Sequence, residues 1–222
     1  MNINTFVMLC VSSSMLWGCS KETAAQNDTA LSATEKNMVI DQDDLTSKKE
    51  ILAPEDDPNL KGTSVLGFKL RDSTFESVKK RLTNYQIGGE SYAGGGILTN
   101  DGSGFNIEGL MGTQFGFDQD QKLAYASMVI KEVDHMNHTT YKKVVNYVQE
   151  NGYKVIDKQD PFVGNRSTTF KTPNHEFVVV NSPHLGGFKV EVEYLTNDFE
   201  QKRRDYQSRQ RVAQEKSESA NF

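Results

Sequence analysis

The sequence predicts an α+β fold in which two helix-plus-antiparallel-sheet units follow each other in tandem, between a disordered N-terminal tether and a polar C-terminal helix. Two helix-type periodic patterns are each followed by several short β-type segments with turn residues between them. Glycine, aromatic and β-branched residues gather in residues 61–197, which carry 15 basic and 15 acidic side chains. We therefore expect one globular region over 61–197, with repeat units 61–133 and 134–197.

The N-terminal 20 residues carry no charged side chain and are largely apolar. The apolar part is shorter than the ~20 residues of a membrane span and has the length of a signal-peptide core. It ends in Leu16-Trp17-Gly18-Cys19-Ser20, which resembles the lipobox of bacterial lipoproteins. The resemblance implies removal of residues 1–18 by cleavage between Gly18 and Cys19, and acylation of the Cys19 thiol by fatty acids such as palmitate. An uncleaved anchor with an incidental cysteine is the alternative.

The same resemblance implies a location and a chemistry. Lipoprotein families associate a serine directly after the lipidated cysteine, here Ser20, with export to the outer membrane, so we expect a lipid-anchored envelope protein that faces the periplasm. Cys10 would leave with the leader and Cys19 would carry lipid, and these are the only cysteines. A disulfide framework, a thiolate nucleophile and cysteine-ligated metal sites are then excluded.

Residues 19–60 form the predicted tether. Residues 20–60 contain four lysines against ten Asp or Glu, a net charge of 4 − 10 = −6, and small polar residues fill much of the rest. Such a segment cannot bury enough apolar surface to offset the entropy of ordering it, so we expect it to be disordered. Its r.m.s. span is about 35 Å for a flexible chain of this length.

The first unit begins with a predicted strand at 65–70 and a helix that starts at Ser73-Thr74-Phe75-Glu76, a capping-box pattern. Gly88-Gly89 is expected to end this helix. Its apolar face consists of Phe75, Val78, Leu82 and Tyr85, and the strands that follow are expected at 97–100, 105–108, 113–117 and 123–130, with a hairpin loop at 118–121.

The second unit repeats the order of the first. A helix opens at Thr139-Thr140-Tyr141 and ends at Asn151-Gly152. Thr140-Tyr141 aligns with Thr74-Phe75 and Val144 aligns with Val78, although two amphipathic helices can share such a face by chance. The apolar face consists of Tyr141, Val144, Val145 and Val148, and the strands are expected at 153–156, 167–171, 176–181 and 188–195.

Residues 198–222 are expected to form a polar helix and tail. Asn197-Asp198-Phe199-Glu200 has the form of a helix start, and oppositely charged residues at i,i+4 spacing follow. Phe199, Tyr206 and Ala213 are seven residues apart and form a thin apolar stripe. We expect Phe199 and Tyr206 to dock an otherwise solvated helix; a coiled-coil partner is the alternative.

The order of these elements over residues 65–195 resembles the small α+β modules of bacterial envelope proteins, namely the β-lactamase-inhibitor-protein-like (BLIP-like) folds and the outer-membrane assembly lipoproteins of the BamE type. The repeated helix starts at Thr74-Phe75 and Thr140-Tyr141 carry this resemblance. Proteins of those families mostly bind other proteins and lack catalytic residues. The resemblance therefore implies a non-catalytic interaction module.

Few side chains suggest chemistry. Asp134, His135 and His138 are the candidates for a metal site, since histidines at i,i+3 share a helix face; the alternative is that they are polar loop and helix-cap residues. Glu191 and Glu193 alternate with apolar residues, which favours the solvated face of a strand over an acid–base pair. We predict no catalytic residue, no metal and no cofactor.

Three functions remain open. The preferred one is a lipid-anchored, non-catalytic envelope protein that presents an α+β module to a protein partner in the periplasm. The alternatives are a small-ligand or glycan-binding lipoprotein, in which Tyr92, Tyr125 and Tyr153 stack on sugars, and an envelope hydrolase that uses the Asp134 and histidine group. The formal charge of −5 and the pI near 5.5 argue against nucleic-acid binding.

Overall fold

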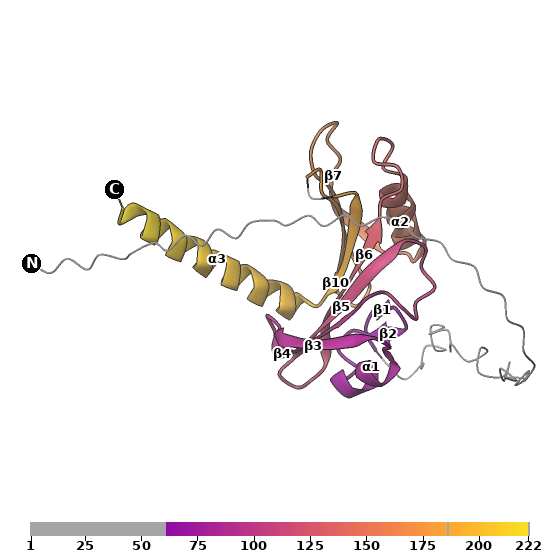
Figure 1. Ribbon diagram of the computed structural model, residues 1–222, viewed down its shortest axis with the longest axis horizontal. Coiled ribbons are helices and arrows are strands. Elements are labelled where there is room, and N and C mark those ends of the chain that lie inside the picture. The colour runs from indigo at the N-terminus through magenta and orange to yellow at the C-terminus, as the bar shows by residue number, and fades with distance from the viewer. Residues whose placement is uncertain (1–60, 186, 222) are drawn as a thin grey trace, which may run out of the picture. The chain divides into compact units, whose positions relative to one another are not determined.

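The computed structural model of the chain describes residues 61–185 and 187–221 (Figure 1). The predicted signal peptide, the cleavage position between Gly18 and Cys19, Ser20 and the tether lie outside the described residues. The described part contains an eight-stranded antiparallel sheet, a two-stranded sheet and three helices, which confirms the predicted α+β class. The elements are β1 (Ser64–Val65), β2 (Phe68–Lys69), α1 (Phe75–Arg81), β3 (Tyr85–Glu90), β4 (Gly94–Asn100), β5 (Leu110–Asp118), β6 (Leu123–Lys131), α2 (Thr139–Glu150), β7 (Lys154–Gln159), β8 (Arg166–Lys171), β9 (Phe177–Ser182), β10 (Lys189–Leu195) and α3 (Asn197–Ser219).

The large sheet has the strand order β3-β4-β5-β6-β10-β9-β8-β7, and its neighbouring strands are antiparallel. Strands from residues 61–133 form one half of the sheet, and strands from residues 134–197 form the other. The halves join where β6 pairs with β10, which places Glu193 opposite Ser127. This pairing joins the two halves into one continuous sheet. It also satisfies the backbone hydrogen-bonding groups of β6 and β10, which would otherwise lie at exposed edges.

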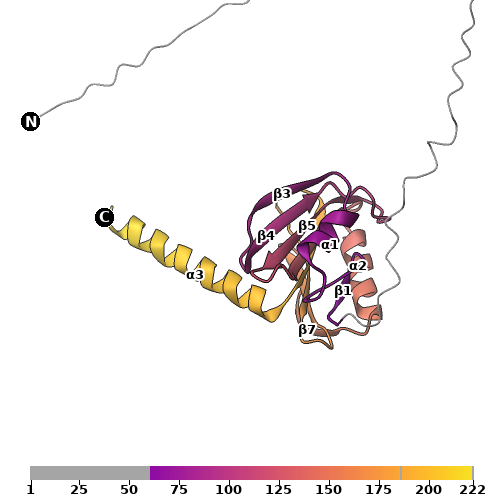
Figure 2. The same ribbon diagram turned by 90° about the horizontal axis from the view of Figure 1, so that it is seen from below.

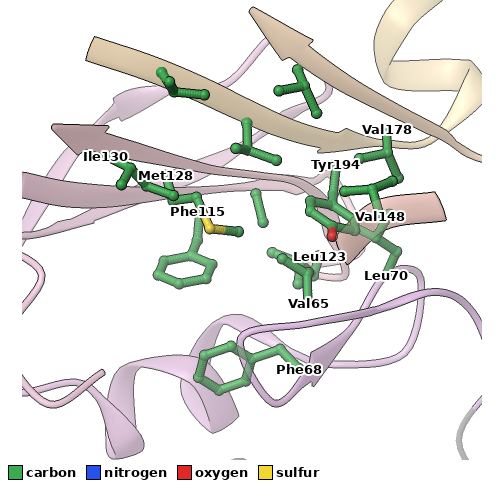
Figure 3. Packing of buried hydrophobic residues seen from close by; sticks show 14 of the residues in the cluster. Val65, Phe68, Leu70, Phe115, Leu123, Met128, Ile130, Val148, Val178 and Tyr194 are labelled. Atoms are coloured by element: carbon green, nitrogen blue, oxygen red, sulfur yellow. The ribbon is translucent and has the colours of Figure 1, made fainter. Parts of the chain in front are cut away.

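One face of the large sheet is covered by α1, α2 and the β1–β2 hairpin, as Figures 1 and 2 show. These elements share a single core with the sheet, to which α1 contributes Val78, α2 contributes Val148 and β2 contributes Phe68. Figure 3 shows this core, in which the rings of Phe68 and Phe115 meet edge to face with centroids 5.3 Å apart. The helices α1 and α2 therefore lie on the same face of the sheet, and the start of α3 packs on the other face.

The opposite face of the large sheet, here called the open face, carries the alternate residues of each strand. In β10, Val190 and Val192 are buried in the core while Glu191 and Glu193 are half-buried on the open face, as their alternation predicts. A row of half-buried side chains crosses six strands of this face, and it consists of Thr99, Gln114, Ser127, Glu193, Val179 and Thr169.

The first helix is shorter than the sequence predicts. α1 ends at Arg81, and residues 85–90 form β3 instead of a further helical turn. Asn84 has a φ of 51°, a left-handed conformation that does not continue a helix. Tyr85 and Gly88-Gly89 therefore lie in an edge strand, so the prediction that they complete and end the helix is wrong. Pairing with β4 outweighs the local helical periodicity.

The cap of α1 also differs from the predicted one. Thr74, and not Ser73, is the N-cap residue: its Oγ1 accepts a hydrogen bond from the Ser77 amide at 3.2 Å. The Ser77 Oγ accepts a hydrogen bond from the Thr74 amide at 2.9 Å. The capping box is therefore shifted by one residue: Ser77, and not Glu76, supplies the side chain that bonds back to the N-cap amide.

Two predicted strands are wrong. Residues 65–70 form the β1–β2 hairpin, because Leu66 and Gly67 have φ values of 52° and 75° and make a tight turn. Residues 105–108 lie in the loop between β4 and β5, where Phe105 and Ile107 pack against the core. The other predicted strands, the hairpin loop, α2 and α3 are confirmed. None of the helices in the described part is long and apolar enough to cross a membrane.

Candidate functional site

The start of α3 is fixed to the open face of the large sheet. The Thr196 amide donates to the Ala124 carbonyl at 3.0 Å, and the Thr196 Oγ1 caps the helix by accepting from the Phe199 amide at 3.2 Å. Phe199 is 3% exposed and forms a second, smaller buried cluster with Ala93, Ala124 and Leu195. Beyond Arg203, in its second turn, α3 extends away from the sheet (Figure 1), and its residues from position 204 onward are exposed.

Four aromatic rings run from the sheet to the third turn of α3. Tyr125 of β6 stacks on Phe199, with centroids 4.6 Å apart and an interplanar angle of 10°. Tyr92, from the β3–β4 turn, meets Phe199 edge to face at 5.8 Å and lies against Tyr206 at 5.3 Å. Phe199 is therefore the buried centre of the run, whereas Tyr92 and Tyr206 keep exposed ring faces.

A network of charges lies beside these rings. Arg203 of α3 donates to both carboxylate oxygens of Glu193 at 3.1 Å and to Glu200 at 2.9 Å. Burial alone would lower the pKa of Arg203, but the charges of Glu193 and Glu200 outweigh burial and raise it. Tyr125 donates its hydroxyl proton to Glu193 at 2.8 Å, and burial, together with the Glu193 charge, raises the pKa of Tyr125. Arg203 therefore stays charged and Tyr125 stays a donor.

The rings and charges line a groove of about 940 Å³ between α3 and the open face, here called the α3 groove. Gly116 of β5 lies in its floor, where an added Cβ would come within 3.5 Å of Ser91, Tyr125 and Phe199. The Ser91 Oγ donates to the Phe117 carbonyl and accepts from the Ala93 amide, so this hydroxyl is held by backbone groups. The α3 groove offers a ligand the exposed rings of Tyr92 and Tyr206, next to the paired charges of Arg203 and Glu193.

The structure brings two of the three predicted tyrosines into this groove. Tyr92 and Tyr125 line it, but Tyr153 packs against the main core on the covered side of the sheet. Arg203 was not predicted as a site residue, because its pairing with Glu193 joins α3 to β10 and no local spacing signals it. Only the position of Glu193 is indicated by the sequence, because the alternation of polar and apolar residues in β10 places its side chain on the open face.

The predicted metal-site candidates do not converge. The Asp134 carboxylate accepts from the Met136 and Asn137 amides at 3.1 Å, and the His135 ring stacks on Phe188 with centroids 4.3 Å apart. His138 is the N-cap residue of α2. Across residues 61–185 and 187–221, no three His, Cys, Asp or Glu side chains are grouped closely enough to hold a metal ion.

The first turn of α2 is capped by a carboxylate that sequence reasoning missed. Glu132 is buried, and its two oxygens accept from the Thr140 and Tyr141 amides at 2.9 and 3.0 Å. Burial alone would raise the pKa of Glu132, but these hydrogen bonds outweigh burial and lower it. His138 contacts Arg166 through its Nε2, and burial and the Arg166 charge lower the His138 pKa. Glu132 therefore has a structural role as the cap of α2.

A second groove, of about 800 Å³, lies on the covered side between α2, the β1–β2 hairpin and the loop before β5. It is lined mainly by apolar side chains, among them Val144, and an ion pair of 3.5 Å joins Lys143 and Glu108 at its rim. The α3 groove is the candidate functional site, because it combines exposed aromatic rings with a fixed charge network. Comparison of the chain with protein-family models, with curated proteins and with solved structures finds no match.

Proposed function

We propose that this protein is a lipid-anchored, non-catalytic component of the bacterial envelope that binds a protein partner in the periplasm through the α3 groove. The lipobox-like segment that ends at Gly18-Cys19 supports lipidation of Cys19, and Ser20 supports a place in the outer membrane. The α3 groove supports the binding role. The observation that carries the proposal is the run of four rings beside the Arg203–Glu193 pair, on the sheet face where α3 begins.

The tyrosine and arginine side chains of the α3 groove support protein binding rather than catalysis as the role of this site. Tyr, Trp and Arg are the residue types that contribute most of the binding energy at protein interfaces. Tyr92 and Tyr206 present exposed rings, and the contacts of Tyr92 with buried Phe199 and with Tyr206 restrict these rings before a partner binds. The exposed remainder of α3 adds a polar surface next to the groove.

We also propose that the globular part consists of two repeat units, 61–133 and 134–197. In each unit one helix precedes four antiparallel strands, and the strand order of the sheet is mirrored about the β6–β10 pair. The helix starts Thr74-Phe75 and Thr140-Tyr141 are alike. This arrangement supports the resemblance to BLIP-like and BamE-like envelope modules.

Site-specific photocrosslinking of the full chain in cells tests the protein-binding proposal. A photoreactive phenylalanine analogue replaces Tyr206, which is 45% exposed in the α3 groove, or Tyr147, which is 54% exposed on α2 as the matched control. We expect a discrete crosslinked protein from position 206 and not from position 147. Equal crosslinking from both positions, or none from position 206, contradicts the proposal.

A glycan ligand is the second candidate, and the pair of exposed rings 5.3 Å apart, Tyr92 and Tyr206, favours it. Tyr125 does not add a stacking surface, because Phe199 covers its face. Binding of soluble peptidoglycan fragments to the purified chain, lost in Tyr92→Ala and kept in Tyr147→Ala, would favour this candidate. Protein binding predicts no saturable response to these fragments.

A further inference from the structure

The most exposed apolar side chains of the described residues lie together on three loops. The loops are the β6–α2 loop, the β7–β8 loop and the β9–β10 loop, and each contributes two of these side chains. All six are between 62% and 98% exposed, whereas no other large apolar side chain of the described part exceeds 59%. They are Val133, Met136, Phe162, Val163, Leu185 and Phe188.

The antiparallel register places these loops at the same end of the large sheet. Figure 1 shows the loops next to β7 and α2 at the upper end, whereas α3 leaves from the lower end. Contacts join the loops: the Glu132 amide donates to the Phe188 carbonyl at 2.8 Å, and the His184 amide donates to the Asn165 side chain at 2.8 Å. The three loops therefore form one surface, here called the loop tip.

The three carboxylates next to the loop tip are each held by other groups of the described residues, and one of them, Asp160, pairs with a cation. Asp160 is paired with Arg166 at 2.6 Å, and Asp134 accepts from the Asn137 side chain at 2.7 Å. Glu132 is buried and caps α2. Lys131, by contrast, has no ion-pair partner in the described part of the chain and lies exposed where β6 ends. The loop tip therefore presents apolar side chains with a free cation behind them.

We propose that the loop tip inserts into the surface of a phospholipid bilayer. Contiguous exposed apolar patches mark interaction sites, and protruding apolar side chains backed by cations suit the boundary between headgroups and acyl chains, at a depth of about 5–10 Å. The Arg166 charge offsets that of Asp160 there, and the hydrogen bonds to Asp134 and Glu132 leave the protruding apolar side chains as the groups that would enter the bilayer. The inference goes beyond protein binding at the α3 groove, but the nearness of a membrane rests on the proposed lipid anchor at Cys19.

The test uses single-tryptophan variants of the full chain. Trp17 is the only tryptophan and lies in the predicted leader, so Trp17→Phe ensures that uncleaved protein also has no tryptophan background. Phe162→Trp or Leu185→Trp reports on the loop tip, and Val212→Trp, on exposed α3, is the matched control. The proteins are reconstituted into phosphatidylethanolamine and phosphatidylglycerol vesicles, with or without lipids brominated in their acyl chains, and tryptophan emission is recorded.

We expect the emission of the loop-tip tryptophans to shift to the blue and to be quenched by the brominated lipids, with neither effect at position 212. Equal emission and quenching at all three positions overturns the inference. A loop-tip shift that needs soluble envelope proteins and not vesicles also overturns it, in favour of a protein partner.

The mass of the Cys19 peptide, measured on the same samples, separates the two proposals. Acylated Cys19 with unquenched loop-tip tryptophans retains the lipid anchor and refutes insertion of the loop tip. Unmodified Cys19 with quenched loop-tip tryptophans refutes the anchor and supports insertion.

Discussion

Replacing Phe199 by alanine removes the buried centre of the aromatic run and tests whether α3 is docked through it. Full burial of a phenylalanine side chain contributes about 1.5–3 kcal/mol, and Phe→Ala in a core costs about 3–5 kcal/mol once the cavity is included. The cluster around Phe199 is small and borders the open α3 groove, so we expect the low end, about 3 kcal/mol. For a domain of this size, that loss lowers Tm by about 6–12 °C.

Chemical denaturation and thermal unfolding of Phe199→Ala measure this loss. Tyr206→Ala is the matched control, because its half-exposed ring lies at the end of the run and its removal is expected to cost less than about 1 kcal/mol. A loss below about 1 kcal/mol for Phe199→Ala as well would refute the account of how α3 is held.

Three further predictions concern the anchor, the core and the cap of α2. Cys19→Ala should leave the protein soluble or unprocessed, because stable anchoring needs more than one acyl chain or signal; full membrane partition in cell fractionation would contradict lipidation. Val78→Ala should cost about 2–3 kcal/mol in denaturation because Val78 is fully buried, whereas Val144→Ala should cost less than about 1 kcal/mol because Val144 is half-buried beside the second groove, and equal costs would contradict these burials. Glu132→Gln should destabilise the protein by about 1 kcal/mol at pH 7 through loss of the α2 cap. The pKa of Glu132 is lower in the folded than in the unfolded state, so its contribution to stability is present above the unfolded pKa and is lost as pH falls through the folded pKa. A stability difference between Glu132→Gln and wild type that persists unchanged in acid would contradict this role of Glu132.

The spacing of apolar residues predicted the helices and strands whose conformation agrees with their local sequence pattern. α2 and the strands β6 and β10 appear where spacing and turn residues place them. The end of α1 was mispredicted because Tyr85 continues the helical spacing, yet β3 pairs with β4. Val144 was aligned with Val78, but the structure buries Val145 and Val148 more deeply on α2, since the helix packs with a rotated face.

The candidate site was only partly predictable. Tyr92 and Tyr125 are visible in the sequence as aromatic residues, but their meeting with Phe199 requires α3 to dock on the open face. Glu193 and Arg203 are ten residues apart across a helix start, and their pairing depends on the angle at which α3 leaves β10. No sequence pattern encodes such tertiary geometry.

The central claim is that a protein partner binds in the α3 groove. It is tested most directly by the affinity of the purified protein for the partner that photocrosslinks to position 206. The comparison is between Tyr206→Ala, in the α3 groove, and Tyr147→Ala, on the covered side of the sheet. Because truncation of an interface tyrosine that dominates binding costs about 2 kcal/mol or more, Tyr206→Ala should raise Kd by at least about tenfold, with Tyr147→Ala close to wild type. Wild-type affinity in Tyr206→Ala, with both variants folded, would contradict binding through the α3 groove.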